Sequence, residues 1–172
     1  AGYIGSHTCV VLLEAGHDVT VIDNLCNSSA IALQRVQELA GRSLRFVQGD
    51  IRSRDDLDRA FVGGIDAVIH FAALKAVGES CEQPLAYFDN NIGGTIALMQ
   101  AMEAHGVECL VFSSSATVYG EPDSVPVPED APLRVTNPYG RTKLAMEQLI
   151  GDWCAARGYP AGREAGWRRR FR

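Results

Sequence analysis

At 172 residues the chain has the length of one domain, and its 47% hydrophobic and 22% charged content is ordinary for a soluble globular protein. No apolar run reaches the roughly 18 residues that a membrane span needs and no signal peptide opens the chain, so we expect no membrane association and a cytoplasmic location. The net charge of −5 argues against a nucleic-acid-binding domain, which would be basic.

The cysteines are scattered and odd in number, and none belongs to a CxxC pair or a Cys/His cluster. This pattern predicts reduced cytosolic thiols and no metal site. The cysteines are Cys9, Cys26, Cys81, Cys109 and Cys154.

A glycine-rich turn opens the chain. Gly2 and Gly5 form a G-x-x-G pattern, and the apolar spacing that follows, up to Gly16, predicts a helix. Backbone N–H groups at such a turn can approach a phosphate, and the helix dipole favours its charge. From these residues alone, a plain glycine turn is the alternative. A dinucleotide-binding fold would also need a strand and a further glycine before Ala1, and this chain does not contain them.

A buried strand is expected over residues 18–23. It ends in Asp23, which comes 18 residues after Gly5. In a dinucleotide-binding fold, a carboxylate at this place holds the adenosine ribose diol and repels a 2′-phosphate, which favours NAD over NADP. An aspartate that caps a helix or forms a turn is the alternative.

Further helices and strands alternate along the chain. We expect a helix over residues 30–40, a strand over 44–48 and a short helix over 55–61 that Ser53 caps. Between the last two, Asp50 and Ile51 either flank an adenine ring or form a simple turn.

The next predicted strand covers residues 66–73 and ends in small residues, which leave room for a ligand. Within it, His70 is expected to be a core histidine rather than a catalyst. Residues 74–80 are expected to form a loop, and a long helix should run from Pro84 to about residue 105. A buried amide inside a helix needs a partner, so Asn90 is a candidate for a backbone or ligand contact.

Three serines follow the strand predicted over residues 108–112. Hydroxyl groups at residues 113–115 would face the ligand crevice of an α/β sheet, unless they form an ordinary serine-rich turn. A proline-rich loop then leads to a helix that Asn137 can cap. Tyr139 and Lys143 lie one turn apart on this helix, where the ammonium group would favour a phenolate that acts as a base. The same spacing also fits an ordinary surface pair.

The alternation of strands and helices predicts an α/β fold with a doubly wound, Rossmann-like parallel sheet. We expect a partial cofactor-binding domain over residues 1–158, and a disordered tail rich in arginine over residues 159–172. The first strand of the fold is expected to be absent. Because that strand would be the centre of the sheet, its neighbours would lack a hydrogen-bonding partner.

Six motifs occur in one order: residues 2–7 (GYIGSH), 23–28 (DNLCNS), 49–51 (GDI), 70–80 (HFAALKAVGES), 112–120 (FSSSATVYG) and 138–143 (PYGRTK). With them the chain resembles, as far as about residue 158, the N-terminal, NAD-binding part of the UDP-glucose 4-epimerase family of extended short-chain dehydrogenases/reductases. The resemblance implies NAD as cofactor, a UDP-hexose substrate, and a homodimer formed through residues 84–105 and 138–155. It also implies a C-terminal substrate domain, which this chain lacks.

The resemblance assigns roles to residues along the whole chain. The implied cofactor-binding residues are Gly2, Tyr3, Ile4, Gly5, Asp23, Asn24, Asn27, Ser28, Asp50, Ile51, Phe71, Ala72, Ala73, Lys75, Asn90, Ser113, Tyr139 and Lys143. The implied catalytic residues are Ser115, Tyr139 and Lys143.

The implied reaction interconverts UDP-galactose and UDP-glucose. Tyr139 removes the proton of the sugar 4-hydroxyl, hydride leaves C4 for the nicotinamide, the 4-keto sugar turns over, and hydride returns to its other face. Ser115 shares the hydroxyl proton, and Lys143 bonds the nicotinamide ribose. Without the substrate domain, this chain is expected to be impaired.

Other functions stay open. A sugar 4,6-dehydratase is disfavoured, because Ala116 and Thr117 stand where such enzymes carry an acid pair after the first hydroxyl residue. A related decarboxylase or uronate epimerase is not excluded. A non-catalytic dinucleotide-binding module is the third alternative, although it would have no need for Ser115, Tyr139 and Lys143.

Overall fold

A computed structural model describes residues 1–159, in which helices alternate with short parallel strands. These residues form two compact units, which are described separately. One unit comprises Ala1–Ile65 and Ala97–His105, and the other comprises Asp66–Ile96 and the chain from Gly106 onward. Apart from Tyr159, the predicted Arg-rich tail lies outside the described residues.

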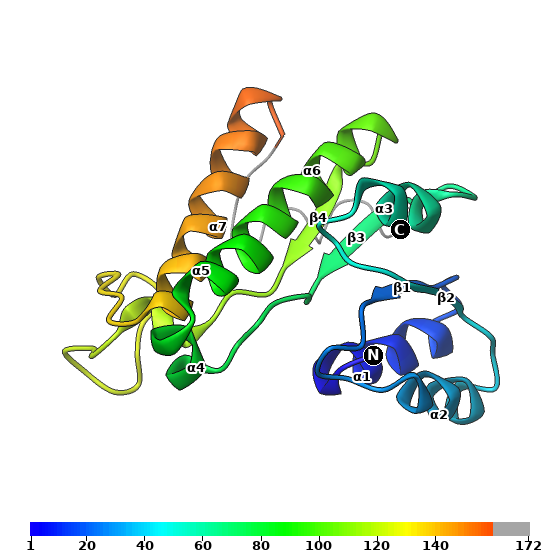
Figure 1. The fold of residues 1–172 in the computed structure, drawn as a ribbon, viewed down its shortest axis with the longest axis horizontal. Helices are drawn as coiled ribbons and strands as arrows, with labels where there is room; N and C mark the ends of the chain where they lie inside the picture. Colours follow the sequence, from blue (N-terminus) through cyan, green and yellow to red (C-terminus); the bar gives the residue numbers. More distant parts are fainter. Residues whose placement is uncertain (160–172) are drawn as a thin grey trace. The chain divides into compact units, whose positions relative to one another are not determined.

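The first unit contains a two-stranded parallel ladder and three complete helices (Figure 1). In chain order the elements are α1 (Tyr3–Glu14), β1 (Thr20–Asp23), α2 (Ala30–Ala40), β2 (Arg45–Gln48) and α3 (Arg54–Phe61). Thr20 pairs with Arg45 and Asp23 with Gln48. Because both strands run in the same direction, the loops that follow Asp23 and Gln48 leave the ladder at one edge.

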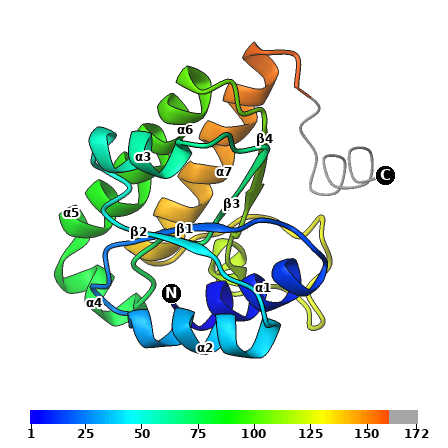
Figure 2. The ribbon, with the colours of Figure 1, turned by 90° about the vertical axis from the view of Figure 1, so that its right-hand side faces the viewer.

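Helices α1 and α2 lie side by side (Figure 2) and enclose a small apolar core. Cys9, Leu13 and Val36 form its buried centre. The partly buried side chains around them are Val10, Val19, Val21, Ala40 and Leu44. The helix predicted over residues 30–40 is confirmed by α2, whose alternation of apolar and polar residues points Val36 into this core.

The start of the chain differs from the predicted turn. Helix α1 already begins at Tyr3, with Gly2 in an extended conformation as its N-cap. Gly5 therefore lies inside the first helical turn rather than before it, and its φ is not positive. The N–H groups of this first turn have no partner within the helix.

The second unit contains the other parallel ladder. Strand β3 (Ala67–His70) pairs with β4 (Cys109–Phe112), from Ala67 opposite Cys109 to His70 opposite Phe112. The Ser113 N–H continues the ladder by donating to the His70 carbonyl at 3.3 Å. Within the described residues each of the four strands has one hydrogen-bonded neighbour. Two separate ladders agree with the prediction of a doubly wound sheet without its first strand.

Two predictions for the segment between β3 and β4 need correction. Residues 74–80 are not all loop, because α4 (Val77–Glu82) begins among them, and the Ala76 N–H is accepted by the Tyr87 hydroxyl at 3.0 Å. The long helix predicted from Pro84 is also interrupted. It consists of α5 (Pro84–Tyr87), the π-helical turn η1 (Phe88–Gly93) and α6 (Gly94–Ala104). Periodicity alone does not reveal the extra residue that a π turn accommodates.

The last described helix, α7 (Pro138–Ala156), packs against α4, α5, η1 and the 3₁₀ turn η2 (Ala116–Tyr119). The cap predicted for this helix is confirmed, since the Asn137 side chain accepts the Gly140 N–H at 2.8 Å and Pro138 occupies the first turn. Over residues 1–159, no helix has the length and apolar character needed to cross a membrane.

Candidate active site

The first turn of α7 brings Tyr139 and Lys143 into the interior of the second unit. The two side chains stand one helical turn apart and are 8% and 4% exposed. An ordinary surface pair, the alternative that the spacing allowed, is therefore wrong. A phenol and an amine in a buried position are a combination that can exchange protons with a ligand.

Lys143 is anchored at the end of strand β4. Its Nζ donates to the Ser113 carbonyl at 2.8 Å and lies 4.9 Å from the centre of the Phe112 ring. Burial lowers the pKa of Lys143 to about 8, although the negative charge of Glu147 opposes this effect. The side chain thus holds a proton that it can release near neutral pH.

Ser115 lies at the start of η2, in contact with the same end of α7. Its Oγ accepts hydrogen bonds from the backbone N–H of Thr117 at 3.2 Å and from the Thr117 hydroxyl at 3.0 Å. With its oxygen used as an acceptor twice, the Ser115 hydroxyl can direct its own hydrogen toward a ligand oxygen.

A close approach of backbone to backbone holds η2 against α7. A Cβ atom at Gly140 would lie 3.0 Å from the Thr117 carbonyl oxygen, which is tighter than almost all real contacts. Glycine at this position therefore lets the turn that carries Ser115 pack directly on the turn that carries Tyr139. The structure places all three predicted catalytic residues on segments that touch each other.

A buried amide, which sequence reasoning did not single out, joins these segments. Asn91 is fully buried in η1, and its Oδ1 accepts the Leu74 N–H at 2.8 Å. Its Nδ2 donates to the Leu74 carbonyl at 3.0 Å and to the Thr142 hydroxyl at 3.0 Å. Asn90, the predicted ligand contact, is partly buried and donates to Asn91 at 2.9 Å. The spacing of Asn91 and Thr95 at i and i+4 was the available signal.

His70 belongs to the same buried network but has no role in the predicted chemistry. Its Nε2 lies 2.9 Å from the Thr95 hydroxyl, which donates to the Asn91 carbonyl. Because that hydroxyl has a single hydrogen, which it gives to Asn91, His70 must donate from Nε2. Burial, and then the charge of Lys143, lower the pKa of His70 to about 4. His70 is thus a core histidine, as expected.

The remaining predicted ligand contacts of this unit follow strand β3. Phe71, Ala72 and Ala73 are partly buried, while Lys75 is exposed. The chain then enters α4, whose Glu79 accepts the Tyr87 hydroxyl at 2.7 Å. This segment therefore presents two alanines and one exposed cation next to a turn held by hydrogen bonds.

In the first unit, the predicted site residues gather at the edge where β1 and β2 end. Burial alone would raise the pKa of Asp23, but hydrogen bonds from Leu25 N, the Ala1 ammonium and the Ser28 hydroxyl lower it overall. The carboxylate is therefore ionised at neutral pH. Gly2 provides no capping side chain for α1, so the N–H groups of Tyr3, Ile4 and Gly5 can serve an anion.

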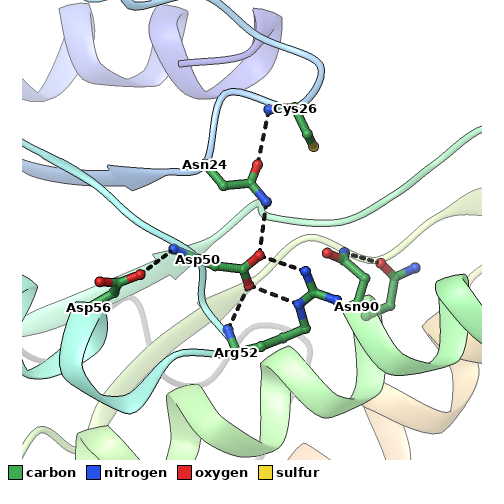
Figure 3. Close-up of polar contacts among 7 residues, drawn as sticks. Asn24, Cys26, Asp50, Arg52, Asp56 and Asn90 are labelled. Atoms are coloured by element: carbon green, nitrogen blue, oxygen red, sulfur yellow. Dashed lines mark hydrogen bonds and ion pairs between the residues drawn. The ribbon is translucent and has the colours of Figure 1, made fainter.

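Asp50 is the centre of a second polar cluster in this unit (Figure 3). Arg52 donates to both of its carboxylate oxygens, at 2.9 and 2.7 Å, and Asn24 donates to it at 3.1 Å. These bonds, those from Arg52 foremost, hold the pKa of Asp50 well below its usual range. Asn24 thus links the loops after β1 and β2. Arg52, which sequence reasoning missed, fixes the carboxylate.

The other predicted residues of this unit lie in the same loops. Ile51 is buried and Asn27 is exposed. The Gly49 position tolerates no side chain, since a Cβ atom there would lie 2.7 Å from the Asp56 Cβ. In the described part of the chain, no group of three or more His, Cys, Asp or Glu side chains is placed to hold a metal ion.

Comparison with known proteins agrees with this arrangement. Residues 1–162 match the family model described as the NAD dependent epimerase/dehydratase family. UDP-glucose 4-epimerase of Bacillus subtilis (strain 168) is 57% identical over 153 residues, which are 88% of this chain and 45% of that protein. The enzyme of the same name from Dictyostelium discoideum is 54% identical over 157 residues, 91% of this chain and 46% of that protein.

Solved structures give the same relation. UDP-glucose-4-epimerase from Stenotrophomonas maltophila, with bound NAD and formylated UDP-arabinopyranose, superposes with a TM-score of 0.87 at 54% identity, covering 91% of this chain and 47% of that one. The enzyme from Bifidobacterium longum in complex with NAD+ and UDP gives 0.89 at 46% identity, with the same coverage. The fold is thus Rossmann-like α/β, and the chain spans about half the length of the relatives it matches.

Proposed function

The chain belongs to the NAD dependent epimerase/dehydratase family, and on this premise we propose that it provides the NAD site and the proton-transfer residues for interconverting UDP-galactose and UDP-glucose. The observation that carries the proposal is the buried first turn of α7. There Tyr139 and Lys143 share a face, next to the turn that carries Ser115.

The residues of the first unit fit a dinucleotide. The uncapped N–H groups at the start of α1 suit a pyrophosphate, and the ionised Asp23 suits a ribose diol and disfavours a 2′-phosphate. Asn24, Asn27 and Ser28 would complete the ribose contacts, and Asp50 and Ile51 would flank the adenine. The family resemblance also implies cofactor contacts by Phe71, Ala72, Ala73, Lys75, Asn90 and Ser113.

Bound NAD would supply a reversible hydride acceptor. The chain's own residues move the proton. Tyr139 Oη takes the proton of the sugar 4-hydroxyl during oxidation and gives it back after the 4-keto sugar has turned over. The Ser115 hydroxyl donates to the same sugar oxygen, and Lys143, one helical turn from Tyr139, would bond the nicotinamide ribose. The two positions directly after Ser115 are Ala116 and Thr117, which carry no acid, and this favours epimerisation over the elimination of water.

Replacing Tyr139 by phenylalanine tests this assignment. In the full-length protein we expect Tyr139→Phe to lower kcat for UDP-galactose by about 10²–10⁴-fold, because the transferred proton loses its acceptor. The variant should still bind NAD, as measured by equilibrium dialysis. Tyr159→Phe is the matched control, since its ring packs edge to face against Trp153, far along α7 from Tyr139. Undiminished turnover in Tyr139→Phe would refute the mechanism, and turnover of UDP-glucuronate alone would refute the substrate.

Two further features belong to the same proposal. We propose a homodimer formed through residues 84–105 and 138–155, supported by the exposed apolar side chains Leu85, Phe88 and Ile96 on the first stretch. Light scattering that shows only monomer at micromolar concentration would contradict it.

We also propose a cytoplasmic location, supported by five cysteines that are all free thiols. Secretion of a tagged full-length protein would contradict this location.

A further inference from the structure

Ser80 connects two parts of the second unit that are far apart in sequence. It is fully buried at the end of the segment that follows β3. Its Oγ donates to the Val77 carbonyl at 2.6 Å and accepts the backbone N–H of Tyr139, 59 residues away, at 3.2 Å. The hydroxyl thus caps α7 from outside that helix.

The N–H that Ser80 accepts would otherwise have no partner. Tyr139 is the second residue of α7, and N–H groups of a first turn find no carbonyl within their own helix. The usual cap, Asn137, serves the Gly140 N–H instead. Because the bond between Tyr139 and Ser80 is buried, water does not replace the serine.

The carbonyl of Tyr139 is held from the same direction. It accepts the Thr142 hydroxyl at 2.7 Å, and the oxygen of that hydroxyl accepts the Asn91 amide. Asn91 in turn bonds both the N–H and the carbonyl of Leu74. The N–H and the carbonyl of Tyr139 are therefore both tied to the two ends of one short segment, residues 74–80.

The segment that holds Ser80 is itself held by hydrogen bonds. At the start of α4, the Ala76 N–H donates to the Tyr87 hydroxyl at 3.0 Å, and that hydroxyl donates to Glu79 at 2.7 Å. A hydroxyl group on such a support can set the position of what it binds. A hydroxyl group on a flexible loop could not fix the position of its partner in this way.

We propose that Ser80 is a positioning residue for the base Tyr139. It fixes the phenol of Tyr139 relative to the cofactor-lining residues 71–75, which precede Ser80 in the chain. This inference rests on the proposed function. The Ser80 side chain touches neither substrate nor cofactor in this scheme. It acts through the backbone of Tyr139, where a displacement of about 1 Å can lower a rate by about 100-fold.

Three variants of the full-length protein test the proposal. Ser80→Ala removes the acceptor, Ser80→Cys fills the same space with a weaker acceptor, and Ser80→Thr keeps the hydroxyl oxygen. We expect kcat to fall about 10- to 100-fold in the Ala and Cys variants. KM for UDP-galactose and Kd for NAD should stay within about threefold of the original values, because the binding contacts remain. Ser80→Thr should restore kcat. Ser29→Ala, which removes the cap of α2 by the same chemical change, should leave kcat unchanged.

Hydrogen exchange of the Tyr139 amide gives a readout that needs no turnover. Its protection should fall in Ser80→Cys and return in Ser80→Thr, while protection in α2 stays constant. If kcat in Ser80→Cys equals that of the original protein, or if KM and Kd rise in step with the loss of kcat, the proposal is overturned. If the original protein has no epimerase activity, the proposed function fails. Unchanged exchange at Tyr139 in Ser80→Cys then overturns the Ser80 proposal separately.

Discussion

His70 should make the second unit sensitive to acid. The imidazole is 3% exposed, and the charge of Lys143 adds to the effect of burial, so its pKa falls from the usual 6.5 to about 4. Between about pH 4 and pH 6.5, His70 binds a proton in the unfolded chain but not in the native chain. Stability contributed by neutral His70 is therefore complete above pH 6.5 and is lost as pH falls toward 4.

The size of this effect follows from the two pKa values. A change from 6.5 to about 4 corresponds to about 3 kcal/mol once the pH is below both. Of this, about 2 kcal/mol should be lost between about pH 7 and about pH 5. That is a large share of the stability of an ordinary domain.

The measurement compares the chain with His70→Gln, which does not titrate and whose amide can still donate to Thr95. Urea unfolding, followed by tryptophan fluorescence at both pH values, gives the loss of stability for each protein. The loss in His70→Gln should be smaller by about 2 kcal/mol. The exposed His7 provides the control, because His7→Gln should lose as much as the original chain. Equal losses in His70→Gln and the original chain would refute the reasoning.

Two other substitutions test packing and buried charge. Gly120 has a φ of +62°, and a Cβ atom there would overlap the Arg134 carbonyl, so Gly120→Ala should lower the free energy of unfolding by about 3 kcal/mol. The control is Gly106→Ala, where φ is +69° but the space around the glycine is open, and it should lower the free energy of unfolding by only about 1 kcal/mol. If denaturant unfolding gives the same loss for both variants, the steric argument is contradicted. Lys143→Met should abolish turnover, yet its free energy of unfolding at pH 7 should match or exceed that of the original chain. Burial lowers the pKa of the ammonium from 10.5 to about 8, which corresponds to a cost of about 3 kcal/mol that methionine does not have. A clear fall in the urea midpoint would contradict this.

Helix caps and the spacing of apolar residues, which depend only on neighbouring residues, predicted most helices and strands of this fold. The caps by Ser53 and Asn137 follow from the hydrogen-bonding needs of a helix start, and both were predictable from a few neighbouring residues. The helical turn at Val77 was not, because Gly78 lowers helix propensity there. The contact that anchors the turn comes from Tyr87, on the next helix.

In the candidate site too, contacts between neighbouring residues could be predicted from the sequence, and contacts between distant residues could not. Adjacent residues on one helix, such as Tyr139 and Lys143, can be placed on one face from their spacing alone. On α7, Asn91 and Ser80 have partners that lie 51 and 59 residues away, and no periodicity encodes these contacts. Of the two neighbouring amides, the sequence suggested Asn90 for a contact, yet the buried one is Asn91, because the π turn changes the phase of the helix.

The π turn at Phe88–Gly93 gives this segment a particular evolutionary constraint. Each residue of a helix advances the chain by about 100°, so losing one residue before Asn91 would rotate Asn91 and Thr95 away from their partners outside the helix at once. These partners are Leu74, Thr142 and His70. A single substitution removes only the contacts of one side chain. Drift in this stretch should therefore proceed by exchange of side chains while the number of residues stays constant, and insertions and deletions should collect in the exposed loop over residues 121–134.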